Sequence, residues 1–273
     1  MIAATIAQEI GVSQSQVDTA LKLLVEGNTV PFIARYRKEA TGGLDDTQLR
    51  TIDERASYLR ELEERKESII KAIDEQGKLT DSLREQITSC ESKARLEDLY
   101  LPYKKRRKTK ADKAKEAGLE PLVDKLIKHV DEDPASFAAD YKTDGYEDEK
   151  AVLDGARAIL IDRFATDADL VGEVRDTMFA NGTMSASVVE GKEAAGKKYS
   201  DYFDFSDSFT SLPSHRILAL FRGESEGILQ LNLNPGDDDT YESLIAQRFN
   251  LNRAASQWLA DAVRGGWRTK LLI

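Results

Sequence analysis

Cysteine, histidine, proline and long apolar runs are all scarce in this 273-residue sequence. The single cysteine, Cys90, excludes an internal disulfide and gives no sign of an oxidising compartment. Two histidines and one cysteine offer no zinc-ligand spacing. No apolar run approaches the roughly 20 residues that a membrane helix needs, and the first residues lack the basic stretch of a signal peptide. We therefore expect a cytoplasmic protein with no metal and no membrane partner.

Only 6 prolines and 17 glycines interrupt the chain, which favours long helices over many short strands. Charged residues make up 32% and hydrophobic residues 41%, as in a charge-rich globular protein. Apolar spacing and start signals predict a mainly α fold, with short strands at 186–189 and 228–233 forming a minor, two-stranded β element. The expected helices follow residue 13, span 45–76, 80–89, 92–100, 121–129, 147–164, 167–180 and 199–203, and begin near 134, 240 and 258.

Two capping boxes mark the clearest helix starts. Ser13 with Gln16, and Asp45 with Gln48, place an N-cap side chain three residues before a side chain that can return the hydrogen bond. Between these helices, the apolar residues of 29–44 are expected to anchor a loop whose cations, Arg35 among them, stay in water. The helix from Trp258 onward has no stop signal, so we expect the sequence to continue beyond Ile273.

Positive charge is concentrated in one segment of an acidic chain. The net charge is -10, yet residues 104–115 carry +7, with eight cations against Asp112, which leaves -17 for the rest. A localised positive patch on an acidic body guides a polyanion to one place. Tyr100 and Tyr103 lie beside it and can stack on unpaired bases. The alternative is a mobile, solvated loop whose charge only aids solubility. The candidate nucleic-acid-binding residues are Tyr103, Lys104, Lys105, Arg106, Arg107, Lys108 and Lys110, with Arg35, Arg37 and Lys38 as a second group.

The second group has its own alternative. Arg35 or Arg37 can instead pair with carboxylates of the long helix that follows, in which case neither would be free for a ligand.

Signals of catalysis are weak. Residues 191–198 match the glycine and lysine spacing of a phosphate-binding P-loop, but Lys198 stands where Ser or Thr should hold magnesium. The alternating β-rich pattern of nucleotide-binding domains is also missing. Cys90, His129 and His215 have no local signature of a nucleophile or base. We therefore predict a non-catalytic protein with no cofactor.

Five segments closely resemble the N-terminal region of the Tex family of bacterial transcription accessory proteins. They occur in the family's order and span most of the chain: GNTVPFIARYRKEATGGL (27–44), LEDLYLPYK (96–104), YFDF (202–205), LPSHR (212–216) and FRG (221–223). The resemblance implies an elongated multi-helix region with a nested helix-turn-helix-like subdomain. We assign that subdomain, with the basic segment, to 63–117 and the helical body to 1–62 and 118–273.

In the family, this region leads into ribonuclease-H-like, helix-hairpin-helix and OB-fold RNA-binding domains, none of which fits within these residues. The resemblance therefore implies the N-terminal part of a transcription accessory factor that helps to position the whole protein on RNA or DNA and on the transcription machinery. The alternative is a structural module that docks on RNA polymerase or ribosomal partners without touching nucleic acid.

Overall fold

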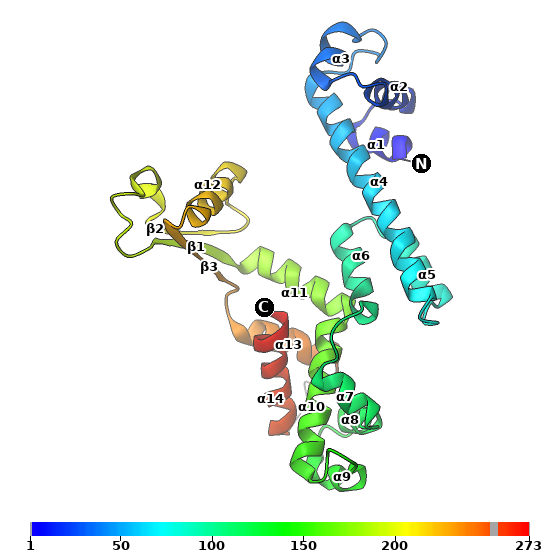
Figure 1. Ribbon diagram of the computed structural model, residues 1–273, viewed down its shortest axis with the longest axis vertical. Coiled ribbons are helices and arrows are strands. Elements are labelled where there is room, and N and C mark those ends of the chain that lie inside the picture. The colour runs from blue at the N-terminus through cyan, green and yellow to red at the C-terminus, as the bar shows by residue number, and fades with distance from the viewer. Residues whose placement is uncertain (1, 252–255, 273) are drawn as a thin grey trace. The chain divides into compact units, whose positions relative to one another are not determined.

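The computed structural model describes residues 2–251 and 256–272. The chain divides into two compact units, residues 1–103 and 104–273 (Figure 1). The boundary between the two units, after residue 103, falls inside the range 63–117 that was assigned to a nested subdomain. The assignment of that subdomain stays a prediction.

In the first unit, three short helices pack on the beginning of a long one. Ile6, Val17 and Ile33 each come from a different short helix and are completely buried, as are Leu49 and Ile52 of the long helix. These side chains form one cluster, so burial of apolar surface holds the four helices together. The helices are α1 (Ile2–Ile10), α2 (Gln14–Val25), α3 (Val30–Tyr36) and α4 (Asp46–Asp74).

The two predicted capping boxes are confirmed at the starts of α2 and α4. The expected loop at 29–44 is wrong in part, because Val30–Tyr36 forms α3. Pro31 fits its first turn, where a backbone N–H has no partner within the helix. The apolar residues in this stretch therefore anchor a helix, and only the residues after Tyr36 form a loop.

The end of α4 packs against α5 (Asp81–Thr88) and α6 (Lys93–Tyr100), which is followed by the 3-10 turn η1 (Leu101–Tyr103). A bidentate ion pair links α4 to α6: Arg65 Nε and Nη2 donate to the Glu97 carboxylate at 2.6 and 3.0 Å. The predicted helix ranges are close to those observed, whereas the helix-turn-helix-like character of this group stays a prediction.

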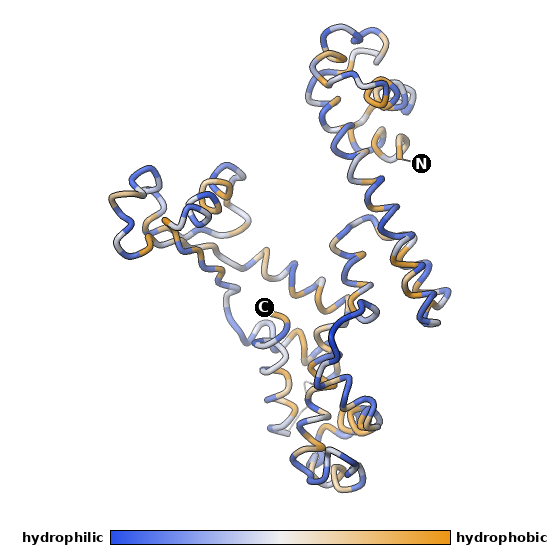
Figure 2. The backbone as a smooth tube through the Cα atoms, viewed as in Figure 1, coloured by the Kyte–Doolittle hydropathy of each residue, from blue (hydrophilic) through white to orange (hydrophobic). Residues whose placement is uncertain are grey.

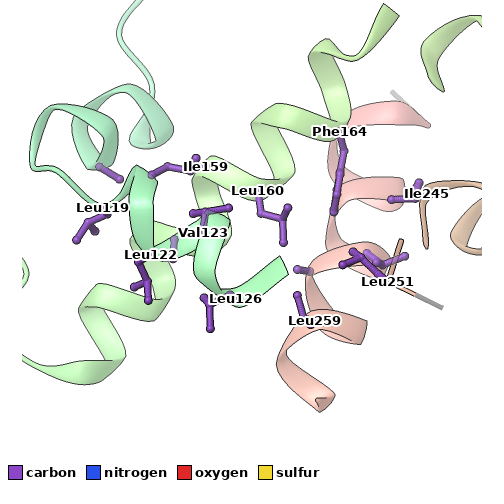
Figure 3. Close-up of a cluster of buried hydrophobic side chains, with 14 of the residues drawn as sticks. Leu119, Leu122, Val123, Leu126, Ile159, Leu160, Phe164, Ile245, Leu251 and Leu259 are labelled. Atoms are coloured by element: carbon purple, nitrogen blue, oxygen red, sulfur yellow. The ribbon is translucent and has the colours of Figure 1, made fainter. Parts of the chain in front are cut away.

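The second unit is built around α10, which contacts α7, α8, α9, α11 and α14. Figure 3 shows how side chains of α8 and α10, such as Val123 and Leu160, meet Leu259 of α14 in one buried cluster. Elsewhere in the core, the Tyr241 and Trp267 rings stack with their centroids 4.1 Å apart. The helical elements are α7 (Lys110–Glu116), α8 (Glu120–Lys128), α9 (Pro134–Ala138), η2 (Ala139–Tyr141), α10 (Glu149–Thr166), α11 (Ala168–Asn181), α13 (Asp238–Arg248), α14 (Gln257–Gly266) and the π-helix η4 (Trp267–Leu271).

A small antiparallel sheet follows α11. Its strands are β1 (Thr183–Val188), β2 (Asp204–Ser208) and β3 (Leu229–Asn234), in the order β2-β1-β3. Met184 and Ala186 face a buried cluster that includes Leu220 of α12 (Ser214–Ser225) and Tyr199 of the 3-10 helix η3 (Lys197–Tyr202). The mainly α fold with a minor β element is confirmed, but the expectation of two strands was wrong because β2 adds a third.

None of the helices within the described ranges is long and apolar enough to cross a membrane.

Candidate nucleic-acid interface

The basic segment, residues 104–115, opens the second unit. Figure 2 shows the stretch that leads into α7 as a hydrophilic run. Lys104 to Lys108 are exposed and precede α7. Thr109 caps α7: its backbone N–H donates to Asp112 Oδ2 at 2.8 Å, and its hydroxyl oxygen accepts from the Asp112 N–H at 3.2 Å. The backbone N–H of Thr109 is the main cause that lowers the pKa of the Asp112 carboxyl. The segment therefore ends in a well-defined helix start.

One buried carboxylate holds two of the eight cations. Asp162, on α10, has a side chain only 8% exposed. Its Oδ1 accepts from Arg106 Nη2 at 2.5 Å and its Oδ2 accepts from Lys115 Nζ at 2.9 Å. Because each oxygen takes one cation, Asp162 fixes both ends of the segment to α10. A third cation, Lys108, lies 2.5 Å from the Glu116 carboxylate.

The other five cations are exposed, and within the described ranges none has a carboxylate partner: Lys104, Lys105, Arg107, Lys110 and Lys113. They remain available to a ligand, whereas the three paired cations would have to give up an internal partner first. Of the tyrosines next to the segment, Tyr100 lies under the Arg65 guanidinium at 5.4 Å. Tyr103 is half-buried, and its backbone carbonyl accepts from Gln76 Nε2 at 3.0 Å.

The second predicted group lies at the end of α3 in the first unit. Arg35, Arg37 and Lys38 are all exposed. In the part of the chain that the structure describes, none of them pairs with a carboxylate, so the alternative in which Arg35 or Arg37 binds the long helix is wrong. Instead, their guanidinium groups lie over aromatic rings, Arg35 at 6.0 Å from the Tyr36 centroid and Arg37 at 5.8 Å from that of Phe32.

Sequence reasoning missed three residues that contribute to these sites. Asp162 is buried and distant in sequence, so no local signal marks it. Phe32 and Tyr36 lie in the stretch 29–44, whose apolar residues were expected to anchor a loop. Their side chains are instead 38% and 62% exposed. Their spacing of four within a helical stretch is the signal that places both rings on one face.

Of the groups considered for catalysis, Lys198, Cys90 and His129 have structural partners in the described chain, and His215 is exposed. Lys198, in the P-loop-like segment, lies 2.7 Å from the Glu226 carboxylate and belongs to a 3-10 helix, not to the α-helix that cradles a phosphate. The Cys90 thiol is buried and donates to the Ser92 carbonyl, and the His129 ring lies 2.9 Å from Glu132. Across residues 2–251 and 256–272, no group of three or more His, Cys, Asp or Glu side chains is placed to hold a metal ion.

Two family models match the chain. One, described as Tex-like protein N-terminal domain, covers residues 1–74, and the other, Tex central region-like, covers residues 129–273. The chain is 50% identical over 275 residues to the "Transcriptional accessory protein Tex" of Neisseria gonorrhoeae, and 51% identical over 280 residues to "Protein YhgF" of Escherichia coli. Each alignment covers 98% of this chain but 36% of the relative. A human "S1 RNA-binding domain-containing protein 1" is 30% identical over 80% of this chain and 22% of its own length.

Proposed function

Because the chain belongs to the Tex family, we propose that it acts as a non-catalytic, nucleic-acid-binding part of a transcription accessory factor. The basic segment would contact phosphates of RNA or DNA and so help to position the whole protein on nucleic acid and on the transcription machinery. The names of the relatives refer to transcription and to RNA binding, which supports this proposal. No cofactor is needed for such a role.

The observation that carries the proposal is the division of the eight cations. Asp162 holds Arg106 and Lys115, so the segment is attached to α10 at both ends. Of the five unpaired cations, Arg107, Lys110 and Lys113 lie between these attachment points, and Lys104 and Lys105 directly precede the first. The rest of the chain has a net negative charge. Phosphate contacts gain free energy from the release of condensed counterions, and a contact costs least where the cation has no internal partner to lose. The unpaired cations are therefore the expected phosphate contacts.

Arg35, Arg37 and Lys38 are proposed as a second set of contacts, because they too lack carboxylate partners within the described residues. Tyr103 remains a candidate for stacking next to Lys104. The two sets lie in different units, so each can be removed without touching the other.

The affinity of the 273-residue chain for a fluorescein-labelled, 15-nucleotide single-stranded RNA tests the proposal. The test variant is Lys105→Gln/Arg107→Gln/Lys110→Gln. At 0.1 M salt, each lost phosphate contact should weaken binding roughly 5-fold, so three should weaken it about 100-fold.

A charge-matched control removes three exposed lysines elsewhere in the second unit, Lys128, Lys150 and Lys192, by the same change to glutamine. The control should lose little affinity. Equal affinities for the two triple variants would show that total charge, and not the basic segment, governs binding, and the proposal would fail.

One observation favours a second candidate function, docking on RNA polymerase. Helix α12 presents Leu218 and Phe221 to solvent with exposed fractions of 66% and 50%, next to the exposed Arg222. A helix that is only solvated normally turns such side chains inward. An apolar and acidic surface of the polymerase would complement this face. Binding of purified RNA polymerase to the chain, lost in Leu218→Ser/Phe221→Ser and retained in the triple variant of the basic segment, would favour docking.

A further inference from the structure

Two exposed aromatic rings lie side by side among the cations at the end of α3. The Phe32 and Tyr36 centroids are 5.2 Å apart with the ring planes at 45°. The opposite side of the helix is fixed, because Ile33 is completely buried against the rest of the unit. The rings are therefore held in place while much of their surface remains in contact with water.

The loop after α3 is ordered by its own hydrogen bonds. The Gly43 N–H donates to the Lys38 carbonyl at 2.8 Å, and the buried Thr41 hydroxyl donates to the same carbonyl at 3.1 Å. Gln16 Nε2, on α2, donates to the Gly42 carbonyl at 3.0 Å. Gly42 and Gly43 have φ of 64° and 92°, a conformation that other residues rarely adopt. The loop is thus preformed, and binding would require little further ordering.

Beside the rings, this loop borders an open depression of about 770 Å³, lined by residues 35–40 and by the Gly42–Gly43 pair. Its rim holds three cations, Arg35, Arg37 and Lys38, against the single carboxylate of Glu39. Each guanidinium lies near an aromatic ring, which orients it and leaves N–H groups for an anion. Aromatic faces next to unpaired cations are what proteins use to bind the bases and phosphates of an unpaired strand.

We propose that Phe32 and Tyr36 form a stacking platform for unpaired bases, with Arg35, Arg37 and Lys38 contacting the adjoining phosphates. This surface is named here the α3 platform. It would select single-stranded over double-stranded nucleic acid, because bases within a duplex stack on each other and do not offer their faces to a ring. The inference rests on the proposed function, that the chain binds nucleic acid, and adds which form of nucleic acid it prefers.

The test compares binding of the 273-residue chain to the 15-nucleotide single strand and to a duplex of the same length. The test variant Phe32→Leu/Tyr36→Leu keeps an apolar side chain at both positions and removes both rings. Loss of stacking for one base should weaken single-strand binding about 5-fold or more, with duplex binding and the salt dependence unchanged. In the wild type, a single strand carrying 2-aminopurine should change fluorescence on binding, and in the variant this change should be lost.

Two further variants are controls. Tyr36→Phe keeps the ring and should bind as the wild type does. Phe179→Leu removes an aromatic ring of similar exposure, 61%, from α11 in the other unit and should have no effect. Thermal unfolding of each variant establishes that it is folded.

The outcomes separate the two proposals. If the ring variant binds the single strand as tightly as the wild type does, or loses single-strand and duplex affinity equally, the α3 platform is refuted. If the ring variant loses single-strand affinity but the basic-segment triple variant does not, the α3 platform stands and the basic segment is refuted. If the chain binds neither nucleic acid, both proposals fail.

Discussion

Replacing Asp162 by asparagine removes the negative charge that anchors the basic segment, while the side chain at position 162 keeps nearly the same size. Arg106 and Lys115 then lose the charge that each carboxylate oxygen supplied, and the new amide N–H₂ faces one of the two cations. Breaking a fully buried ion pair costs about 3–5 kcal/mol. Here the two cations are 41% and 32% exposed, so water recovers part of that loss. We expect the free energy of unfolding to fall by about 1–2 kcal/mol, and Tm by about 2–8 °C.

Chemical denaturation and calorimetry measure these changes, and hydrogen exchange adds a local measurement. Amide exchange in residues 104–116 should accelerate in Asp162→Asn, whereas exchange at the centre of α4 should not. Asp176→Asn, an exposed carboxylate of α11 with no ion pair in the described structure, is the matched control and should leave Tm unchanged. If Asp162→Asn were as stable as this control and residues 104–116 exchanged as in the wild type, the anchoring role of Asp162 would be refuted.

Two further predictions concern packing and pH. In Gly155→Ala, the new Cβ would lie 2.6 Å from Tyr146 Cε1, so the free energy of unfolding should fall by about 1–3 kcal/mol. Gly172 is also within a helix, but apart from its own helix no atom would lie within 4 Å of the new Cβ, so Gly172→Ala should be neutral or stabilising by up to about 1 kcal/mol. Urea denaturation distinguishes them, and equal destabilisation would contradict the packing around α10. The hydrogen bond from Arg55 lowers the pKa of Glu9 from its usual 4.5, so its contribution to stability is present above pH 4.5 and is lost as pH falls through the lowered value. The stability difference between the wild type and Glu9→Gln, measured by urea denaturation from pH 6 to pH 3, should therefore shrink on acidification, and a difference that stays constant would contradict this.

Local signals in the sequence predicted most of the helices because their causes are local. The caps at Ser13 and Asp45 involve side chains three residues away, and both are observed as expected. Helix α3 was missed because it has only seven residues, and a helix of that length is marginal without tertiary contacts. Its stability depends instead on the burial of Ile33 against other helices, which the local sequence does not reveal.

The third strand was missed for a similar reason. Asp204–Ser208 has one apolar residue among four polar ones, which gives a weak strand pattern on its own. It forms a strand because it pairs with β1, where Phe205 lies opposite Ala186. That pairing depends on residues about 20 positions away, beyond the range of pattern reading.

The candidate site was predictable in part. The concentration of positive charge after Tyr103 is visible in the sequence, but its division into paired and unpaired cations is not. Asp162 lies 56 and 47 positions from the cations that it holds, and only the fold brings them together. The α3 platform was likewise predicted only in part. Its cations were identified from the sequence, but the exposure of Phe32 and Tyr36 was not.

The most direct test of the central claim is the salt dependence of RNA binding. For a single strand, the logarithm of the association constant falls with the logarithm of salt concentration by about 0.7 for each phosphate neutralised. Removing Lys105, Arg107 and Lys110 should therefore reduce the slope by about 2, whereas removing Lys128, Lys150 and Lys192 should leave it unchanged. Equal slopes for the wild type and the first variant would contradict the claim that the unpaired cations of the basic segment contact phosphates.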